Sequence, residues 1–273
     1  MGWGSLFVSG IAVACAGWAA AGSAWAASAC RLEAAGAGTV AAVNDGRSFV
    51  LDDGRQIRLA AIEVPHLPLP GETGRKATAG LAARSVLESM VLGQKIELRQ
   101  KVGAATDRYG RILAFAYVEA GGERSVAHDL VGRGHALVAI HGGERACTGD
   151  LLAQERAARD AKLGLWGEPV YWLMGAEGAA ALLAERGQFT VVEGKVLSVR
   201  ESGGTIYMNF GRRWSQALTV TIPKRQERTF AAAGIAPKQL ENRRVRVRGW
   251  IEERNGPRIE ALRPDQIEVA ERN

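Results

Sequence analysis

Two aspartate-glycine pairs near the start of the chain constrain its fold most strongly. Asp45-Gly46 and Asp53-Gly54 separate three short segments of alternating or apolar residues, at 39–43, 48–51 and 56–59. Glycine takes the positive φ of a tight hairpin turn without steric penalty, so an Asp-Gly pair between apolar runs is a strong hairpin signal. The sequence therefore predicts a three-stranded antiparallel meander.

The pattern after the meander predicts a helix and then two more strands. Apolar residues recur with helical spacing over 76–91, and Gly93 follows in a capping position. We predict strands at 95–100 and 112–119, and a further helix at 151–162. Five strands with one helix after the third describe an OB-type barrel with added helices.

A second group of short strands follows residues 168–187, which we interpret as a helical linker. These predicted strands lie at 190–199, 205–210, 218–222, 243–252 and 257–261. The run from Val245 to Ile251 alternates apolar and basic residues, so we expect one face in the core and Arg246 and Arg248 turned toward a partner. We predict a mainly β, α+β chain with one barrel at 37–167 and a second, small OB-like barrel at 188–273.

The N-terminal segment resembles an export signal. Residues 1–30 contain no charged residue and run from an apolar stretch into small residues, which predicts a signal peptide at 1–26. The mature protein would then be periplasmic or secreted, without a stable membrane span. A retained membrane helix and lipidation of Cys30 are the alternatives.

Cysteine usage is consistent with export. Cys15 would leave with the signal, and Cys30 and Cys147 would remain. Two cysteines in an oxidising compartment favour one disulfide between them, and two unpaired cysteines are the alternative.

The positive charge is concentrated in the C-terminal third. Residues 188–273 hold 16 Lys and Arg against 10 Asp and Glu, which gives +6, whereas the rest of the chain holds 19 of each. This excess favours an anionic partner such as nucleic acid or another polyanion, although a solvated basic face is the simpler alternative. Trp214 and Trp250 are candidate stacking surfaces there, or else core residues.

Two motifs in the first barrel resemble those of the staphylococcal-nuclease-like, or thermonuclease, family. The segments are Arg58-Leu59-Ala60-Ala61-Ile62-Glu63-Val64-Pro65 and Asp107-Arg108-Tyr109-Gly110-Arg111, and Leu165-Trp166 is similar to the end of the family's closing helix. The resemblance covers roughly 37–167. It implies that Arg58 and Arg111 contact the scissile phosphate, with Arg108 and Tyr109 beside them. Planar guanidinium groups suit this task because they hold phosphate oxygens bidentately.

The family's carboxylates are replaced at two positions. Arg47 stands where the first hairpin of the family supplies a metal-binding aspartate, and Asp45 lies two residues earlier. Glu63 takes the place of the second metal-binding aspartate, and His66 stands where the water-activating glutamate is expected. The resemblance therefore implies a divalent cation, Ca²⁺, on Glu63 and Asp45, with His66 as a candidate general base.

The sequence leaves two main functions open, beside a third in which the protein is an envelope scaffold that uses both barrels for protein contacts. One is phosphodiester hydrolysis of single-stranded DNA or RNA by an exported nuclease, which the family resemblance implies. The other is a catalytically degenerate module of the cell envelope that binds nucleic acid or another polyanion. Arg47 supports the second, because extra arginines favour phosphate binding over metal binding.

Overall fold

The computed structural model describes residues 1, 32–101, 103, 106–119, 125–139, 145–167 and 173–270. The first part of the chain contains strands β1 (Glu33–Asp45), β2 (Ser48–Leu51), β3 (Gln56–Leu59), β4 (Ile62–Glu63), β5 (Lys95–Gln100), β6 (Ile112–Val118) and β7 (Leu137–Val138). Its helices are α1 (Arg75–Val91), α2 (Val126–Gly132) and α3 (Arg145–Asp160), and a short 3-10 turn, Gly164–Gly167, follows α3.

Five strands of this part close into a barrel in the order β1-β2-β3-β6-β5. The predicted meander is present as β1, β2 and β3, with Val43 opposite Phe49 and Phe49 opposite Ile57. Strand β3 then pairs with β6 in parallel, Leu59 opposite Ala114. This parallel step matters for the site, because it brings the residues around β3 next to those that precede β6.

The second part of the chain repeats this strand order. Its strands are β8 (Leu173–Gly175), β9 (Phe189–Lys195), β10 (Ser198–Ser202), β11 (Thr205–Asn209), β12 (Thr219–Pro223), β13 (Arg244–Trp250), β14 (Glu252–Glu253), β15 (Pro257–Glu260) and β16 (Ile267–Val269), and its α-helices are α5 (Ala179–Ala184) and α6 (Glu227–Ala232). One sheet has the order β10-β11-β12-β15-β14 and the other β16-β13-β9-β8. The chain runs from β9 into β10 and from β13 into β14. The two central strands of the second sheet therefore continue into the two edge strands of the first. Strands β12 and β15 are parallel, as β3 and β6 are.

The predicted helical linker at 168–187 is only partly helical, which corrects the interpretation from sequence. Residues 168–172 lie outside the described residues, but Leu173–Gly175 forms β8 and pairs in parallel with β9. Met174 opposite Val192 adds this strand to the second part's own sheet. Three residues give too short a pattern for a strand to be recognised in the sequence.

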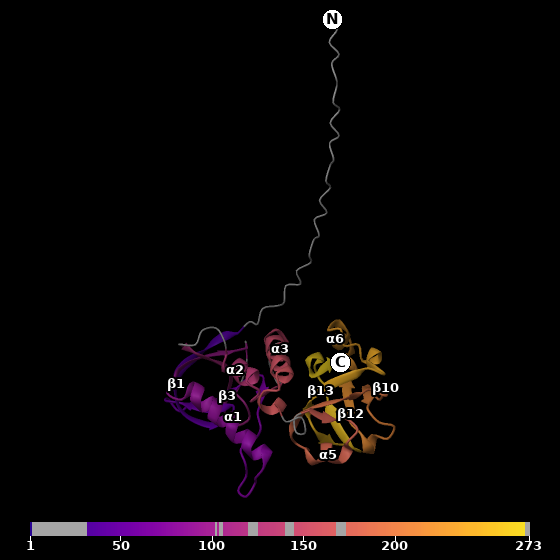
Figure 1. Cartoon of the computed structure of the whole chain (residues 1–273), viewed down its shortest axis with the longest axis horizontal. Coiled ribbons are helices and arrows are strands. Elements are labelled where there is room, and N and C mark those ends of the chain that lie inside the picture. The colour runs from indigo at the N-terminus through magenta and orange to yellow at the C-terminus, as the bar shows by residue number, and fades with distance from the viewer. Residues whose placement is uncertain are drawn as a thin grey trace.

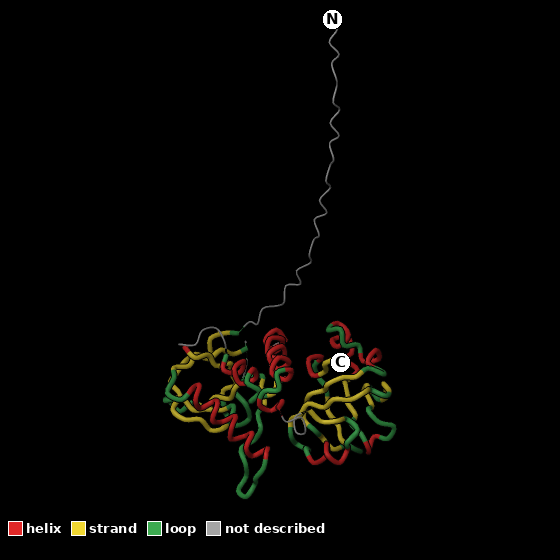
Figure 2. Tube along the Cα trace, viewed as in Figure 1, coloured by secondary structure: helices red, strands yellow, loops and turns green. Residues whose placement is uncertain are grey.

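The two parts pack against each other through an apolar cluster of their own. It combines Leu137, Leu165 and Trp166 from the first part with Phe189 and Val191 from the second. In Figure 1 the indigo-to-magenta part and the orange-to-yellow part lie side by side, with α3 between their barrels. Figure 2 shows the helix α3 on the side of the first part that faces the second, and helices at opposite ends of the second part's strands.

The predictions about the N-terminus concern residues that lie mostly outside the described part. This applies to the signal peptide, to Cys15 and to Cys30. Cys147, in α3, is buried and disulfide-bonded. Its pairing with Cys30 stays a prediction. Among the described residues, no helix combines the length and apolar character that a membrane crossing requires.

Candidate functional site

Three arginines converge at the edge of the first barrel. Arg47 comes from the turn between β1 and β2, Arg58 from the middle of β3, and Arg111 from the turn that precedes β6. The parallel pairing of β3 with β6 sets Arg58 beside Leu113, two residues beyond Arg111. The sequence prediction that Arg58 and Arg111 share a site is thus consistent with the strand pairing.

A single buried carboxylate lies between two of these arginines. Glu63, on β4, is 5% exposed. Its Oε1 accepts a hydrogen bond from Arg58 Nη2 at 3.2 Å, and its Oε2 forms an ion pair with Arg47 Nη1. Arg47 Nη1 also donates to the carbonyl of Ile62 at 3.3 Å. Both oxygens of Glu63 are therefore engaged by guanidinium groups.

Asp107 orders the turn that carries the third arginine. Its Oδ2 accepts from Arg111 Nε at 2.8 Å, and its Oδ1 accepts from the backbone N–H groups of Tyr109 and Arg111 at 2.9 and 3.0 Å. Burial raises the pKa of Asp107, but the hydrogen bonds from Arg111 and Tyr109 outweigh it and hold the pKa below its usual value. Asp107 therefore stays ionised and fixes the direction of Arg111.

An exposed aromatic ring stands between two guanidinium groups of the same turn. Tyr109 is 66% exposed. Its ring centroid lies 4.8 Å from the guanidinium carbon of Arg108 and 5.2 Å from that of Arg111. These cation–π contacts hold the ring at the surface beside the arginines, where a base or sugar of a ligand can reach it.

Arg47, Arg58 and Arg111 lie close enough together for their charges to repel one another. Burial lowers the pKa of Arg58, and the charges of Arg47 and Arg111 lower it further, while Glu63 and Asp107 act in the opposite direction. A guanidinium group remains protonated in proteins despite such shifts. The cluster is therefore cationic throughout the physiological pH range.

The residues expected to bind calcium do not form a site suited to it. Glu63 has both oxygens in ion pairs, and Asp45 Oδ1 accepts from the backbone N–H of Arg47 at 2.9 Å. A hard cation such as Ca²⁺ needs 6–8 oxygen ligands. In the described part of the chain, no group of three His, Cys, Asp or Glu side chains could hold a metal. The guanidinium of Arg47 lies where a cation would compete for Glu63.

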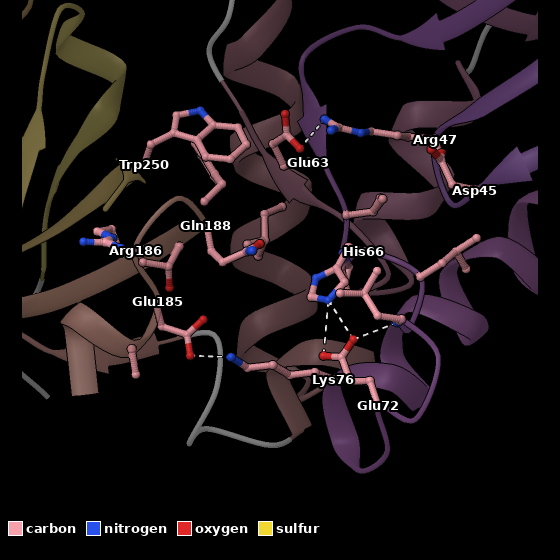
Figure 3. Close-up of a pocket in the computed structure, with 18 of the residues that line it drawn as sticks. Asp45, Arg47, Glu63, His66, Glu72, Lys76, Glu185, Arg186, Gln188 and Trp250 are labelled. Atoms are coloured by element: carbon pink, nitrogen blue, oxygen red, sulfur yellow. Dashed lines mark hydrogen bonds and ion pairs between the residues drawn. The ribbon is translucent and has the colours of Figure 1, made fainter. Parts of the chain in front are cut away.

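His66, the candidate general base, is paired with a carboxylate of its own loop. Its Nε2 lies 3.3 and 3.2 Å from the two oxygens of Glu72. Figure 3 shows the ring directed toward Glu72 rather than toward Glu63. Glu72 Oε2 also accepts from the backbone N–H of Leu69 at 2.9 Å, so the pair belongs to the loop between β4 and α1.

Of the arginine cluster, Arg47 lines a hollow between the two parts of the chain. This hollow has a volume of about 860 Å³ and is lined by both barrels. Arg47, Glu63 and His66 form one wall, and Gln188 and Trp250 contribute to the other (Figure 3). Trp250 packs edge-on against Phe189 with ring centroids 5.9 Å apart. No sequence pattern indicated this second wall, because it depends on how the two parts of the chain dock.

Arg248 does not face a partner, which corrects the prediction from the alternating pattern. Its side chain is 2% exposed and is covered by α3 of the first part. Arg248 Nη1 donates to both oxygens of Glu155, at 2.9 and 2.7 Å, and to the carbonyl of Val138 at 3.1 Å. The alternation separated the two faces of β13 correctly, but at Arg248 the polar face is buried against the first part of the chain.

Arg246 is also held by carboxylates of its own part of the chain. Its Nε donates to Glu193 Oε2 at 2.6 Å and its Nη1 to Glu268 Oε1 at 3.3 Å. The side chain is 21% exposed. Because two carboxylates already pair with the guanidinium of Arg246, it is poorly placed to bind a phosphate, which corrects its prediction as a nucleic-acid contact.

A family model described as staphylococcal nuclease homologue matches residues 56–168. The match contains Arg58, Glu63 and Arg111, whereas Asp45 and Arg47 precede it. It points to a nuclease-like or nucleic-acid-binding function. A search of curated proteins finds no match to the chain.

Proposed function

Starting from residues 56–168 as a staphylococcal nuclease homologue domain, we propose that the protein binds single-stranded nucleic acid through its arginine cluster. The observation that carries this proposal is the excess of guanidinium groups. Arg47, Arg58, Arg108 and Arg111 outnumber the carboxylates of Asp45, Glu63 and Asp107, which leaves one formal positive charge in excess. Phosphate oxygens are the natural ligands of such a cluster.

The charge pattern favours binding over calcium-dependent cleavage. Glu63 is held between Arg47 and Arg58, so a metal would have to displace a guanidinium before it reached the carboxylate. A phosphate faces no such obstacle, because it can share the guanidinium N–H groups that Glu63 leaves unused. Each guanidinium has five N–H donors in a fixed fork.

Hydrolysis is the second candidate, and one observation favours it. The imidazole of His66 is 43% exposed at the rim of the hollow and is paired with Glu72. A neutral imidazole oriented by a carboxylate is a suitable general base near pH 7. In this case Arg58 and Arg111 would stabilise charge on the phosphate, and His66 would take a proton from the attacking water or hydroxyl.

We further propose that the protein is exported and that Cys147 pairs with Cys30. The uncharged segment at 1–30 supports export, and Cys147, which is disulfide-bonded, supports an oxidising compartment. Mass spectrometry of the protein purified from the cell envelope would check both points. Cleavage near Ala26 and a Cys30–Cys147 peptide are expected, and an intact N-terminus with free thiols would contradict them.

Binding and cleavage of labelled single-stranded DNA and RNA test the function. Arg58→Ala and Arg111→Ala should each weaken binding by roughly 10- to 100-fold, since a hydrogen bond to a charged group contributes about 1.5–3 kcal/mol. Arg156→Ala, an exposed arginine on α3, is the matched control and should bind as the wild type does.

The same samples separate the two functions. No cleavage with calcium, magnesium, manganese or chelator, together with binding that depends on both arginines, supports a binding protein. Cleavage that persists in chelator and is lost in His66→Ala supports the hydrolytic alternative. Binding that is unchanged in both arginine variants would refute the proposed site, and competition by an acidic polysaccharide at equal strength would indicate a different polyanion.

A further inference from the structure

The second barrel carries a polar and aromatic sheet face that none of the observations above explains. Residues of β11 and β12 alternate strictly: Ile206, Met208, Val220 and Ile222 are buried in the core. The residues between them point to the opposite face. Arg200, Tyr207 and Thr221 form one row across β10, β11 and β12, and Ser198, Asn209 and Thr219 form the next row.

Two loops turn this face into a shallow hollow of about 710 Å³. The loop between β11 and β12 carries Trp214, which is 60% exposed. The hairpin between β14 and β15, which carries Arg254 and Asn255, lies against that loop, since a Cβ on Gly256 would meet the carbonyl oxygen of Trp214. An indole ring so exposed in a small barrel is not a core residue, so burial does not explain its presence there.

The charge of the hollow is positive and largely uncompensated. Arg200 and Arg254 line it, and within the described residues neither guanidinium group has a hydrogen bond or ion pair. Glu201, the acidic residue of the lining, is already paired with Lys224 at 2.6 Å. Two available guanidinium groups beside two aromatic rings, Tyr207 and Trp214, form a surface suited to an anion that also has flat rings.

A buried polar group on this face also lacks a partner. Thr221 is 3% exposed, lines the hollow and lies between Tyr207 and Glu260 across the sheet. Its Oγ1 is buried and has no hydrogen-bond partner among the described residues. Burying a hydroxyl without a partner is unfavourable by about 1–3 kcal/mol, so such a group is a candidate for ligand contact.

We propose that this face is a second nucleic-acid site, which takes a single strand with its bases stacked on Tyr207 and Trp214 and its phosphates on Arg200 and Arg254. A single strand is required because aromatic side chains stack on bases that are not already stacked in a duplex. Asn209 and Thr221 line the same hollow. The site is separate from the arginine cluster of the first barrel and does not depend on it.

The test measures the salt dependence of binding for the full chain. The probe is a labelled oligothymidine of about 12 nucleotides, within the ~4–16 nucleotides that one barrel of this kind covers, and an oligouridine of the same length compares RNA with DNA. Tyr207→Ala and Trp214→Ala should each weaken binding by roughly 5- to 150-fold and leave the slope of log K against log salt unchanged. Arg200→Ala and Arg254→Ala should each reduce that slope by about 0.7.

Matched variants keep this outcome interpretable. Tyr207→Phe and Trp214→Phe retain a ring and should bind close to wild type, whereas a merely structural role would make them behave like the alanine variants. Arg228→Ala, an exposed arginine on α6, should leave both affinity and slope unchanged.

Repeating the measurements in the Arg58→Ala/Arg111→Ala background separates the two sites. Residual binding that is lost on adding Trp214→Ala would support the second site, even if the first proves inactive. Wild-type affinity and slope in all four alanine variants of the face would overturn the inference and leave the proposed function of the first barrel untouched. Stronger competition by an anionic oligosaccharide than by the oligonucleotides would overturn it as well.

Discussion

Replacing Arg248 by methionine should destabilise the whole protein, although Arg248 touches no proposed ligand. The guanidinium joins β13 of the second barrel to Glu155 on α3 and to the carbonyl of Val138 on β7. Arg248 is 2% exposed and Glu155 is fully buried. In Arg248→Met, Glu155 Oε2 still accepts the hydrogen bond from the backbone N–H of Val138, which is 2.7 Å long in the wild type. The nearest remaining cation is Arg159, whose Nη1 lies 3.9 Å from Glu155 Oε1.

The magnitude follows from the burial of this pair. Breaking a buried ion pair by removing one partner is destabilising by about 3–5 kcal/mol, because the other charge stays buried without compensation. Arg244→Met, on the same strand, is the matched control. Arg244 is paired with Glu193 but is 57% exposed, and exposed pairs contribute about 0–1 kcal/mol.

Urea unfolding followed by circular dichroism measures both variants. A double-mutant cycle with Glu155→Leu gives the coupling between the two side chains. The double variant removes both charges but leaves the buried N–H and C=O of Val138 without these partners, at about 1–3 kcal/mol each. We therefore expect its destabilisation to be close to that of Arg248→Met and far below the sum of the two single variants. A loss in Arg248→Met no larger than in Arg244→Met, or additive single effects, would refute this account.

Three further predictions concern the first barrel. Glu63→Gln should tighten oligonucleotide binding by about tenfold and steepen its salt dependence, because it removes the anion that two guanidinium groups now hold; unchanged binding in an anisotropy titration would show that the cluster is not the site. The pKa of Asp107 is lowered in the folded protein, so the stability that its ionised form contributes is present above its unfolded pKa of about 3.9 and is lost as the pH falls through the lower folded value. Asp107→Asn should therefore be less stable than the wild type at pH 7, and its acid unfolding curve should lose less stability below about pH 4. Gly80→Ala should destabilise the protein by about 1–3 kcal/mol, because the new Cβ would lie 2.0 Å from the carbonyl oxygen of His66. In Gly149→Ala the new Cβ meets no atom within 4 Å, so this variant should gain up to about 1 kcal/mol from helix propensity. Equal melting temperatures for the two variants would contradict the close packing of α1 on the loop that carries His66.

The sequence predicted what depends on local chemistry. The Asp45-Gly46 and Asp53-Gly54 turns occur where hairpin statistics place them, and Gly54 has a φ of +85°. The family resemblance also implied that Arg58 lies near the turn that carries Arg111. These features are specified by a few neighbouring residues, or by the strand order that the family resemblance implies.

Features that depend on docking between distant segments were not predicted. The alternation around Arg248 shows which side chains share a face, but no local pattern shows that Glu155 covers that face from the other barrel. The same limit applies to Trp250, whose place in the hollow depends on the interface. The prediction of Glu63 as a metal ligand has a different difficulty. A carboxylate that lies between two guanidinium groups forms ion pairs with them in preference to binding a metal.

Arg47 determines which sign of ligand the site can accept. Two unit charges about 4 Å apart interact by about 4 kcal/mol at an effective dielectric of 20, so a divalent cation at that distance from the guanidinium would be repelled by about twice as much. A phosphate at the same distance would be attracted by about the single-charge amount. Glu63 does not cancel the repulsion of the cation, because its single negative charge faces two guanidinium groups, Arg47 and Arg58, and the sum of the three charges stays positive. An arginine in place of a carboxylate therefore does more than remove one ligand: it reverses the field at the position where the metal would bind, and that reversal favours the phosphate.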